Sequence, residues 1–102
     1  MAVPPRRGID WTADEYAEIR RLEKLCDASE DWSLECSYTD ADDPWCIIYD
    51  QNRQWIILHM ARIDRQYVVV WPREQRSEKT TIMALAVDSA LEGLRAYRRR
   101  AI

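Results

Sequence analysis

A chain of 102 residues is long enough for one domain with a modest core, and 47% hydrophobic residues with only two glycines exclude a disordered protein. No apolar run is long enough to cross a membrane, and the first residues lack the apolar stretch of a signal peptide, so we expect a cytoplasmic protein. Charge is divided unevenly: residues 1–50 hold five Lys/Arg and thirteen Asp/Glu (net −8), whereas residues 51–102 hold ten and five (net +5).

The beginning of the chain predicts an arm followed by a helix. Residues 1–10 are expected to form a flexible N-terminal arm, and residues 11–102 a single domain. Thr12 followed by Glu15 matches a capping box, in which each residue satisfies a backbone N–H of the other. Apolar residues then recur at helical spacing, which predicts a helix over about 13–27.

Four strands are predicted to follow this helix. Apolar and polar residues alternate from Trp32 to Thr39, which is typical of a strand with one face in water. An acidic loop over residues 40–44 ends this strand, and Pro72 is expected to end the sheet. Apolar runs predict the three remaining strands at about 45–50, 55–63 and 67–71.

The end of the chain predicts a second, longer helix. Ser77 is a candidate N-cap, and an apolar stripe that includes Met83, Val87 and Leu94 predicts a helix over about 78–98. The element order is then α-β-β-β-β-α. We therefore predict an α+β fold, a four-stranded antiparallel meander sheet with the N-terminal helix and the longer C-terminal helix packed on one face.

The central strands bring aromatic residues together on one face of the predicted sheet. If a five-residue loop joins the first of these hairpins and a three-residue loop the second, then Trp45, His59 and Trp71 form one row. This face would hold Trp45, Ile47, Tyr49, Trp55, Ile57, His59, Ala61, Tyr67, Val69 and Trp71. The opposite face would hold Cys46, Ile48, Ile56, Leu58, Met60, Val68 and Val70. A slip of one residue in either loop would change this assignment.

Three interpretations of the aromatic face remain open. It is the helix-packed core, an interface with a second copy or another protein, or a platform for a ligand or single-stranded nucleic acid. Trp and Tyr are enriched at interfaces. Arginines near the sheet rims suit a nucleic acid, but the acidic N-terminal half disfavours a polyanion. The candidate interface or ligand residues are Trp45, Tyr49, Trp55, His59, Tyr67 and Trp71.

No residue pattern predicts catalysis, a cofactor or a metal site. His59 is the only histidine, and strand alternation places Cys46 on the opposite face, which disfavours a Cys–His pair. Asp40, Asp42 and Asp43 lack the Gly and the distal Glu of a calcium loop. Three cysteines without a CxxC motif are expected to be reduced and packed.

The element Asp43-Pro44-Trp45 and the later run HMARIDRQYVV, which starts at His59, resemble an uncharacterised bacterial domain family with a D-P-W element and an H-x-A-R-I-D-x-x-Y-V signature. The resemblance covers the central strands and neither helix, and it brings no known activity or cofactor. It implies one structural signature formed by Trp45, His59, Arg62, Asp64 and Tyr67. Asp64 can satisfy the backbone of a turn, and Arg62 is placed to reach the acidic loop or a helix end.

We therefore predict a small cytoplasmic, non-enzymatic interaction or regulatory protein, which forms a homodimer or binds a protein partner through the aromatic face. One alternative is a nucleic-acid-binding protein that uses the basic C-terminal half, including Arg95 and Arg98–Arg100. Another alternative is a small-molecule binder or enzyme centred on His59.

Overall fold

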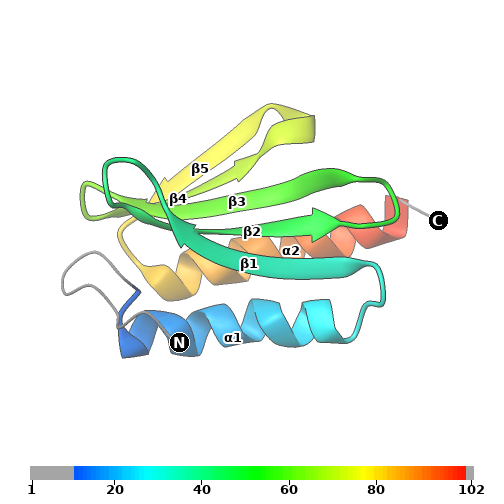
Figure 1. The fold of residues 1–102 in the computed structure, drawn as a ribbon, viewed down its shortest axis with the longest axis horizontal. Helices are drawn as coiled ribbons and strands as arrows, with labels where there is room; N and C mark the ends of the chain where they lie inside the picture. The colour runs from blue at the N-terminus through cyan, green and yellow to red at the C-terminus, as the bar shows by residue number, and fades with distance from the viewer. Residues whose placement is uncertain (1–10, 101–102) are drawn as a thin grey trace.

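The computed structural model describes residues 11–100, and the arm predicted for residues 1–10 lies outside the described residues. The described elements are α1 (Ala13–Asp27), β1 (Trp32–Tyr38), β2 (Pro44–Asp50), β3 (Trp55–Ile63), β4 (Gln66–Trp71), the 3-10 helix η1 (Pro72–Glu74), β5 (Arg76–Thr80) and α2 (Met83–Arg100). The strands pair antiparallel in chain order, β1-β2-β3-β4-β5 (Figure 1). The predicted α+β class is confirmed, but the sheet has five strands instead of four.

The additional strand, β5, has a sequence that the periodicity of apolar residues does not reveal. Its residues RSEKT are all polar, and Ser77-Glu78-Lys79 resembles the start of a helix, yet the whole segment pairs with β4. Charged residues are common on edge strands because they discourage pairing with other chains. Glu78 accepts a hydrogen bond from the Ser89 hydroxyl of α2. The sheet therefore continues beyond Pro72, and α2 begins at Met83 rather than near residue 78.

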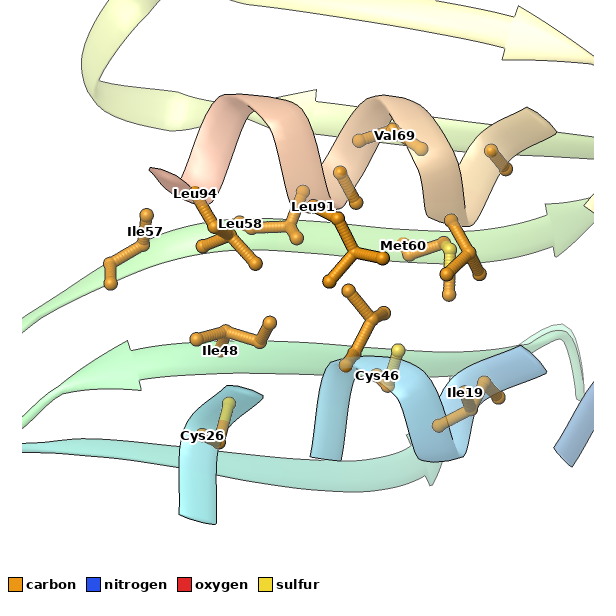
Figure 2. Close-up of a cluster of buried hydrophobic side chains, with 14 of the residues drawn as sticks. Ile19, Cys26, Cys46, Ile48, Ile57, Leu58, Met60, Val69, Leu91 and Leu94 are labelled. Atoms are coloured by element: carbon orange, nitrogen blue, oxygen red, sulfur yellow. The ribbon is translucent and has the colours of Figure 1, made fainter. Parts of the chain in front are cut away.

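Both helices pack on the same face of the sheet and run in the same direction (Figure 1). α1 contacts β1 and α2, and α2 contacts β4 and β5. One hydrophobic core lies between the helices and the sheet, and Figure 2 shows part of it. Its largest fully buried side chains include Ile19, Leu22, Ile48, Leu58, Met60, Val69, Val87 and Leu94.

The capping box predicted at the start of α1 is present. The Thr12 hydroxyl accepts a hydrogen bond from the Glu15 N–H (3.2 Å), and Glu15 Oε1 accepts one from the Thr12 N–H (2.8 Å). Ile19, Leu22 and Cys26 form the buried stripe of this helix. Because these signals are local in sequence, they predict the bounds of α1 correctly.

The β3–β4 hairpin has a shorter loop than the sequence analysis assumed. Ile63 pairs with Gln66, so the loop consists of Asp64 and Arg65 alone. Their φ angles are 52° and 65°, and two successive positive values are typical of a type I′ turn. A loop shorter by one residue exchanges the two faces of β4. Val68 and Val70 therefore lie on the side of His59, and Tyr67, Val69 and Trp71 point toward the helices.

The β2–β3 hairpin contains a β-bulge. Tyr49 pairs with Ile56, whereas the preceding residue of β2, Ile48, pairs with Leu58. Ile57 is therefore the extra residue on β3. Ile57 and Leu58 are consecutive but are both buried in the core, as Figure 2 shows.

These two changes of register separate the predicted row of aromatic residues. Trp45 lies opposite Ala61 instead of His59. Trp71 lies on the helix-packed face and pairs with Arg76 of β5. The predicted row of Trp45, His59 and Trp71 is therefore wrong, because both loops are one residue shorter than assumed and the bulge adds one residue to β3.

Candidate functional site

The face of the sheet that turns away from both helices carries a continuous, mostly apolar strip. Two rows of paired residues cross all five strands, namely Ser37–Trp45–Ala61–Val68–Lys79 and Glu35–Ile47–His59–Val70–Ser77. The central strands supply the apolar members of both rows, and the edge strands β1 and β5 supply the polar ones. We call the half-buried residues of this surface the open sheet face: Trp45, Ile47, Tyr49, Ile56, His59, Ala61, Val68 and Val70.

Three of the six predicted interface residues lie on the open sheet face. They are Trp45, Tyr49 and His59, which come from β2 and β3. Figure 1 shows both helices on the other side of the sheet, so neither helix of residues 11–100 covers this surface. The prediction that aromatic residues and the histidine share a sheet face therefore holds for half of the set.

His59 lies at the centre of the open sheet face, on the middle strand. Its cross-strand neighbours are Ile47 and Val70. Burial among apolar side chains lowers the pKa of His59 below its ordinary value of 6.5, so the imidazole is neutral at pH 7. Five cavities among the described residues are lined by other side chains, and Cys46 points into the core on the opposite face.

The other three predicted interface residues, Trp55, Tyr67 and Trp71, lie on the helix-packed side. Trp71 is 2% exposed and packs against α2 at Gly93. Trp55 and Tyr67 are partly buried against the core cluster. For these three residues the interpretation as core is correct, because the shorter loop and the bulge turn them toward the helices.

Tyr67 belongs to a buried polar cluster that joins the start of α1 to the sheet. The Glu15 carboxylate, 5% exposed, accepts hydrogen bonds from the Tyr67 hydroxyl (2.6 Å) and the Arg62 guanidinium. Burial raises the pKa of this carboxyl, but the hydrogen bonds from the Thr12 backbone, Tyr67 and Arg62 outweigh burial and leave the pKa below 4.5. Burial and the bond to Glu15 raise the pKa of Tyr67 to about 12. Arg62 thus reaches a helix end, one of its two predicted positions.

A second buried carboxylate fixes the opposite end of the sheet. Asp50 is 4% exposed, and its Oδ1 accepts hydrogen bonds from the backbone N–H groups of Asn52 (3.0 Å) and Arg53 (3.1 Å). Its Oδ2 accepts one from the Tyr97 hydroxyl of α2 (2.7 Å). The Trp55 Nε1–H donates to the same hydroxyl (2.9 Å). Trp55 therefore helps to hold the last turns of α2 on the sheet.

The three cysteines are free thiols, as expected, but only two of them are packed. Cys26 and Cys46 are buried, and Cys36 is exposed. Burial raises the pKa of Cys26 to about 11, and a hydrogen bond with Cys36 together with burial raises the pKa of Cys46. Buried thiols with raised pKa values are poor nucleophiles. Within residues 11–100, no three potential ligand side chains gather in a metal-binding arrangement.

Comparison with models of protein families, with curated proteins and with solved structures finds no significant match for this chain. The resemblance of the central strands to an uncharacterised bacterial family therefore stays a prediction. In the part of the chain that the structure describes, no helix is both long and apolar enough to span a membrane.

Proposed function

We propose that this chain is a small, non-enzymatic protein-interaction module that associates with a second copy of itself through the open sheet face. The observation that carries the proposal is the one-sided packing of the sheet: both helices lie on one face (Figure 1), and the residues of the apolar strip lie on the other. Contiguous apolar surface of this kind is typical of interaction sites. Trp45 and Tyr49 are of the residue types that are enriched at interfaces.

The charges on the two edge strands of the sheet support a second copy of the chain as the partner that binds the open sheet face. Glu35 on β1 is acidic and Lys79 on β5 is basic, and they lie in neighbouring rows at opposite edges. A two-fold axis parallel to the strands above β3 would place β1 of each copy over β5 of the other. This arrangement would bring Glu35 close to the partner's Lys79 and the apolar strips into contact, with His59 near the axis.

The size of the surface predicts a dimer of moderate affinity. Neighbouring strands lie about 4.8 Å apart and rise about 3.3 Å per residue, so the open sheet face on β2, β3 and β4 covers roughly 15 by 20 Å, and β1 and β5 widen this surface to roughly 24 by 20 Å on each copy. Specific interfaces bury about 1,000 Å² or more in total. The flat area of this surface on two copies is slightly below this limit, and the additional area of the protruding side chains raises the buried area to it. We therefore expect dissociation in about the micromolar range.

The arrangement of arginines favours self-association over the nucleic-acid alternative. A platform for single-stranded nucleic acid needs basic side chains beside its aromatic residues. The two rows that cross the sheet contain one Lys or Arg, which is Lys79. Arg53, Arg73 and Arg100 instead line a cavity on the helix side of the molecule.

The experiment that tests the proposal is light scattering on the full chain over a series of concentrations. We expect a dimer that dissociates on dilution. Ile47→Lys places a charge at the centre of the open sheet face and should give a monomer. The matched control is Leu85→Lys on α2, where the side chain is 52% exposed and away from the sheet, and it should leave the dimer intact.

Circular dichroism of both variants must show the wild-type fold for the comparison to be valid. A chain that is monomeric at all concentrations contradicts the proposal, and so does a dimer that survives Ile47→Lys. Absorbance at 260 nm on the same peak gives a further outcome, because bound nucleic acid that is lost at high salt would favour the nucleic-acid alternative instead.

A further inference from the structure

A cavity of about 250 Å³ lies on the helix side of the molecule, between the turn after β2, η1 and the last turns of α2. Its main lining residues are Ile57, Trp71, Tyr97, Arg53, Arg73 and Arg100. None of these residues belongs to the open sheet face, so the cavity is independent of the proposed dimer. Its combination of an apolar wall and several guanidinium groups is typical of a site for a small organic anion.

The apolar wall of the cavity is rigid before any ligand binds. Ile57 and Trp71 belong to the core and are each 2% exposed. The Tyr97 hydroxyl is held between Asp50 Oδ2 (2.7 Å) and Trp55 Nε1 (2.9 Å), so the ring has a fixed position. A preformed wall of this kind costs a ligand little ordering entropy, and its aromatic members favour a flat ligand.

The rim of the cavity carries an excess of positive charge. Glu74 also lines the cavity, but it forms ion pairs with Arg100 and with Arg76 (3.2 Å). Arg73 forms no ion pair with the residues that the structure describes. Its guanidinium carbon lies 3.9 Å from the centre of the Trp55 ring. A guanidinium stacked on a ring still directs its in-plane N–H groups outward, where they can bind an anion.

We propose that this cavity binds a small aromatic carboxylate. The planar carboxylate matches the fork of the Arg73 guanidinium, and the ring matches the wall of Trp71 and Tyr97. The volume is below the roughly 300–1,000 Å³ of most small-molecule pockets, which favours a ligand of about ten non-hydrogen atoms over a nucleotide.

The test is the titration of the full chain with phenylacetate, followed by NMR of the indole N–H signals and by tryptophan fluorescence. We expect saturable binding, with a dissociation constant in about the millimolar range or below, and shifts of the Trp55 and Trp71 indole signals. Phenylacetamide has nearly the same shape without the charge, and acetate has the charge without the ring. Each should bind about tenfold more weakly than phenylacetate.

Substitutions of Arg73 test the assigned residue, and the exposed position of this side chain makes misfolding an implausible cause of any loss. Arg73→Gln should weaken phenylacetate binding about tenfold, and Arg73→Lys should have an intermediate effect because it keeps the charge and loses the fork. The matched control is Arg99→Gln, an exposed arginine of α2 outside the cavity lining, which should bind as the wild type does.

Three results would overturn this proposal. The first is equal binding of phenylacetate and phenylacetamide, and the second is an Arg73→Gln variant that binds phenylacetate normally. The third is a single-stranded oligonucleotide that binds through Arg73 and is not displaced by phenylacetate, because this would identify the arginines as a phosphate-backbone site. None of these measurements depends on the oligomeric state of the chain.

Discussion

Trp71 of β4 occupies the space that a side chain at position 93 of α2 would need. A Cβ built on Gly93 would lie 2.3 Å from both Cη2 and Cζ2 of the Trp71 indole, far closer than atoms can approach. Gly93 is therefore required by the close contact of helix and sheet. Its place in the helix interior, which by itself disfavours the helix, is explained by this contact.

Gly93→Ala is expected to destabilise the protein by about 1–3 kcal/mol, although alanine is the better helix former by about 1 kcal/mol. The buried indole cannot move aside without disturbing its neighbours in the core. Urea unfolding measures the change, and the control is the same substitution in a Trp71→Leu background, where the methyl group has room. An equal cost in both backgrounds would show that Trp71 is not the cause.

Glu15→Gln is expected to lower the free energy of unfolding at pH 7 by about 1–3 kcal/mol. The pKa of Glu15 in the folded chain is below its ordinary value of 4.5, so its ionised form is stabilised by folding. This contribution is fully present above pH 4.5 and is lost as the pH falls through the folded pKa.

Thermal unfolding between pH 7 and pH 3 tests this prediction for Glu15. The wild type should lose more stability than Glu15→Gln over the acid part of this range. Tyr67→Phe removes one hydrogen bond from the carboxylate and should give an intermediate dependence on pH. Parallel curves for all three proteins would mean that Glu15 titrates normally.

Arg65→Gly is expected to stabilise the protein by about 0.5–1 kcal/mol. Arg65 has a φ angle of 65°, a conformation that a side chain disfavours and glycine adopts freely. Arg65→Ala loses the same charge but keeps the unfavourable backbone, so it should leave stability nearly unchanged. The denaturant midpoints of the wild type and the two variants measure these changes in stability. If Arg65→Ala stabilises the protein as much as Arg65→Gly does, the loss of charge is the cause instead of the backbone conformation.

Self-association is expected to weaken in acid, as the pH falls through the pKa of His59, which lies below the ordinary value of 6.5. Burial lowers the pKa of His59 below this ordinary value, which means that packing favours the neutral imidazole. Protonation of His59 as the pH falls through this lowered pKa therefore opposes contact between two open sheet faces and raises the dissociation constant. Sedimentation at pH 7.5 and 5.5 measures this shift, and His59→Gln should abolish it. A pH dependence that persists in His59→Gln would exclude His59 as its source.

The predictions that succeeded rest on signals that are local in the sequence. Thr12 and Glu15 are three residues apart and identify the start of α1 directly. The apolar runs of β2, β3 and β4 likewise predict these three strands directly. The sequence of β5 does not predict a strand, because β5 carries only polar side chains and is held by its backbone hydrogen bonds with β4.

The arrangement of side chains within the sheet was harder to predict, because a shift of one residue in the pairing of two strands exchanges the faces on which the side chains lie. Arg65 in a two-residue loop and Ile57 in a bulge determine which face each aromatic residue occupies, and neither position has the glycine that would mark it. The polar clusters depend on still more distant partners. Glu15 and Tyr67 are 52 positions apart, so no periodicity of the sequence connects them.

Charged side chains on both edge strands limit how far copies of this chain can assemble. β5 carries Arg76, Glu78 and Lys79, and Glu35 places a charge at the centre of β1, whose other face is apolar, so charges interrupt both edges along which a sheet could extend from chain to chain. The growth of fibrils by edge pairing is therefore disfavoured at both ends of the sheet. In the proposed dimer, two copies that meet face to face bury the open sheet face of both, and the assembly would close at two.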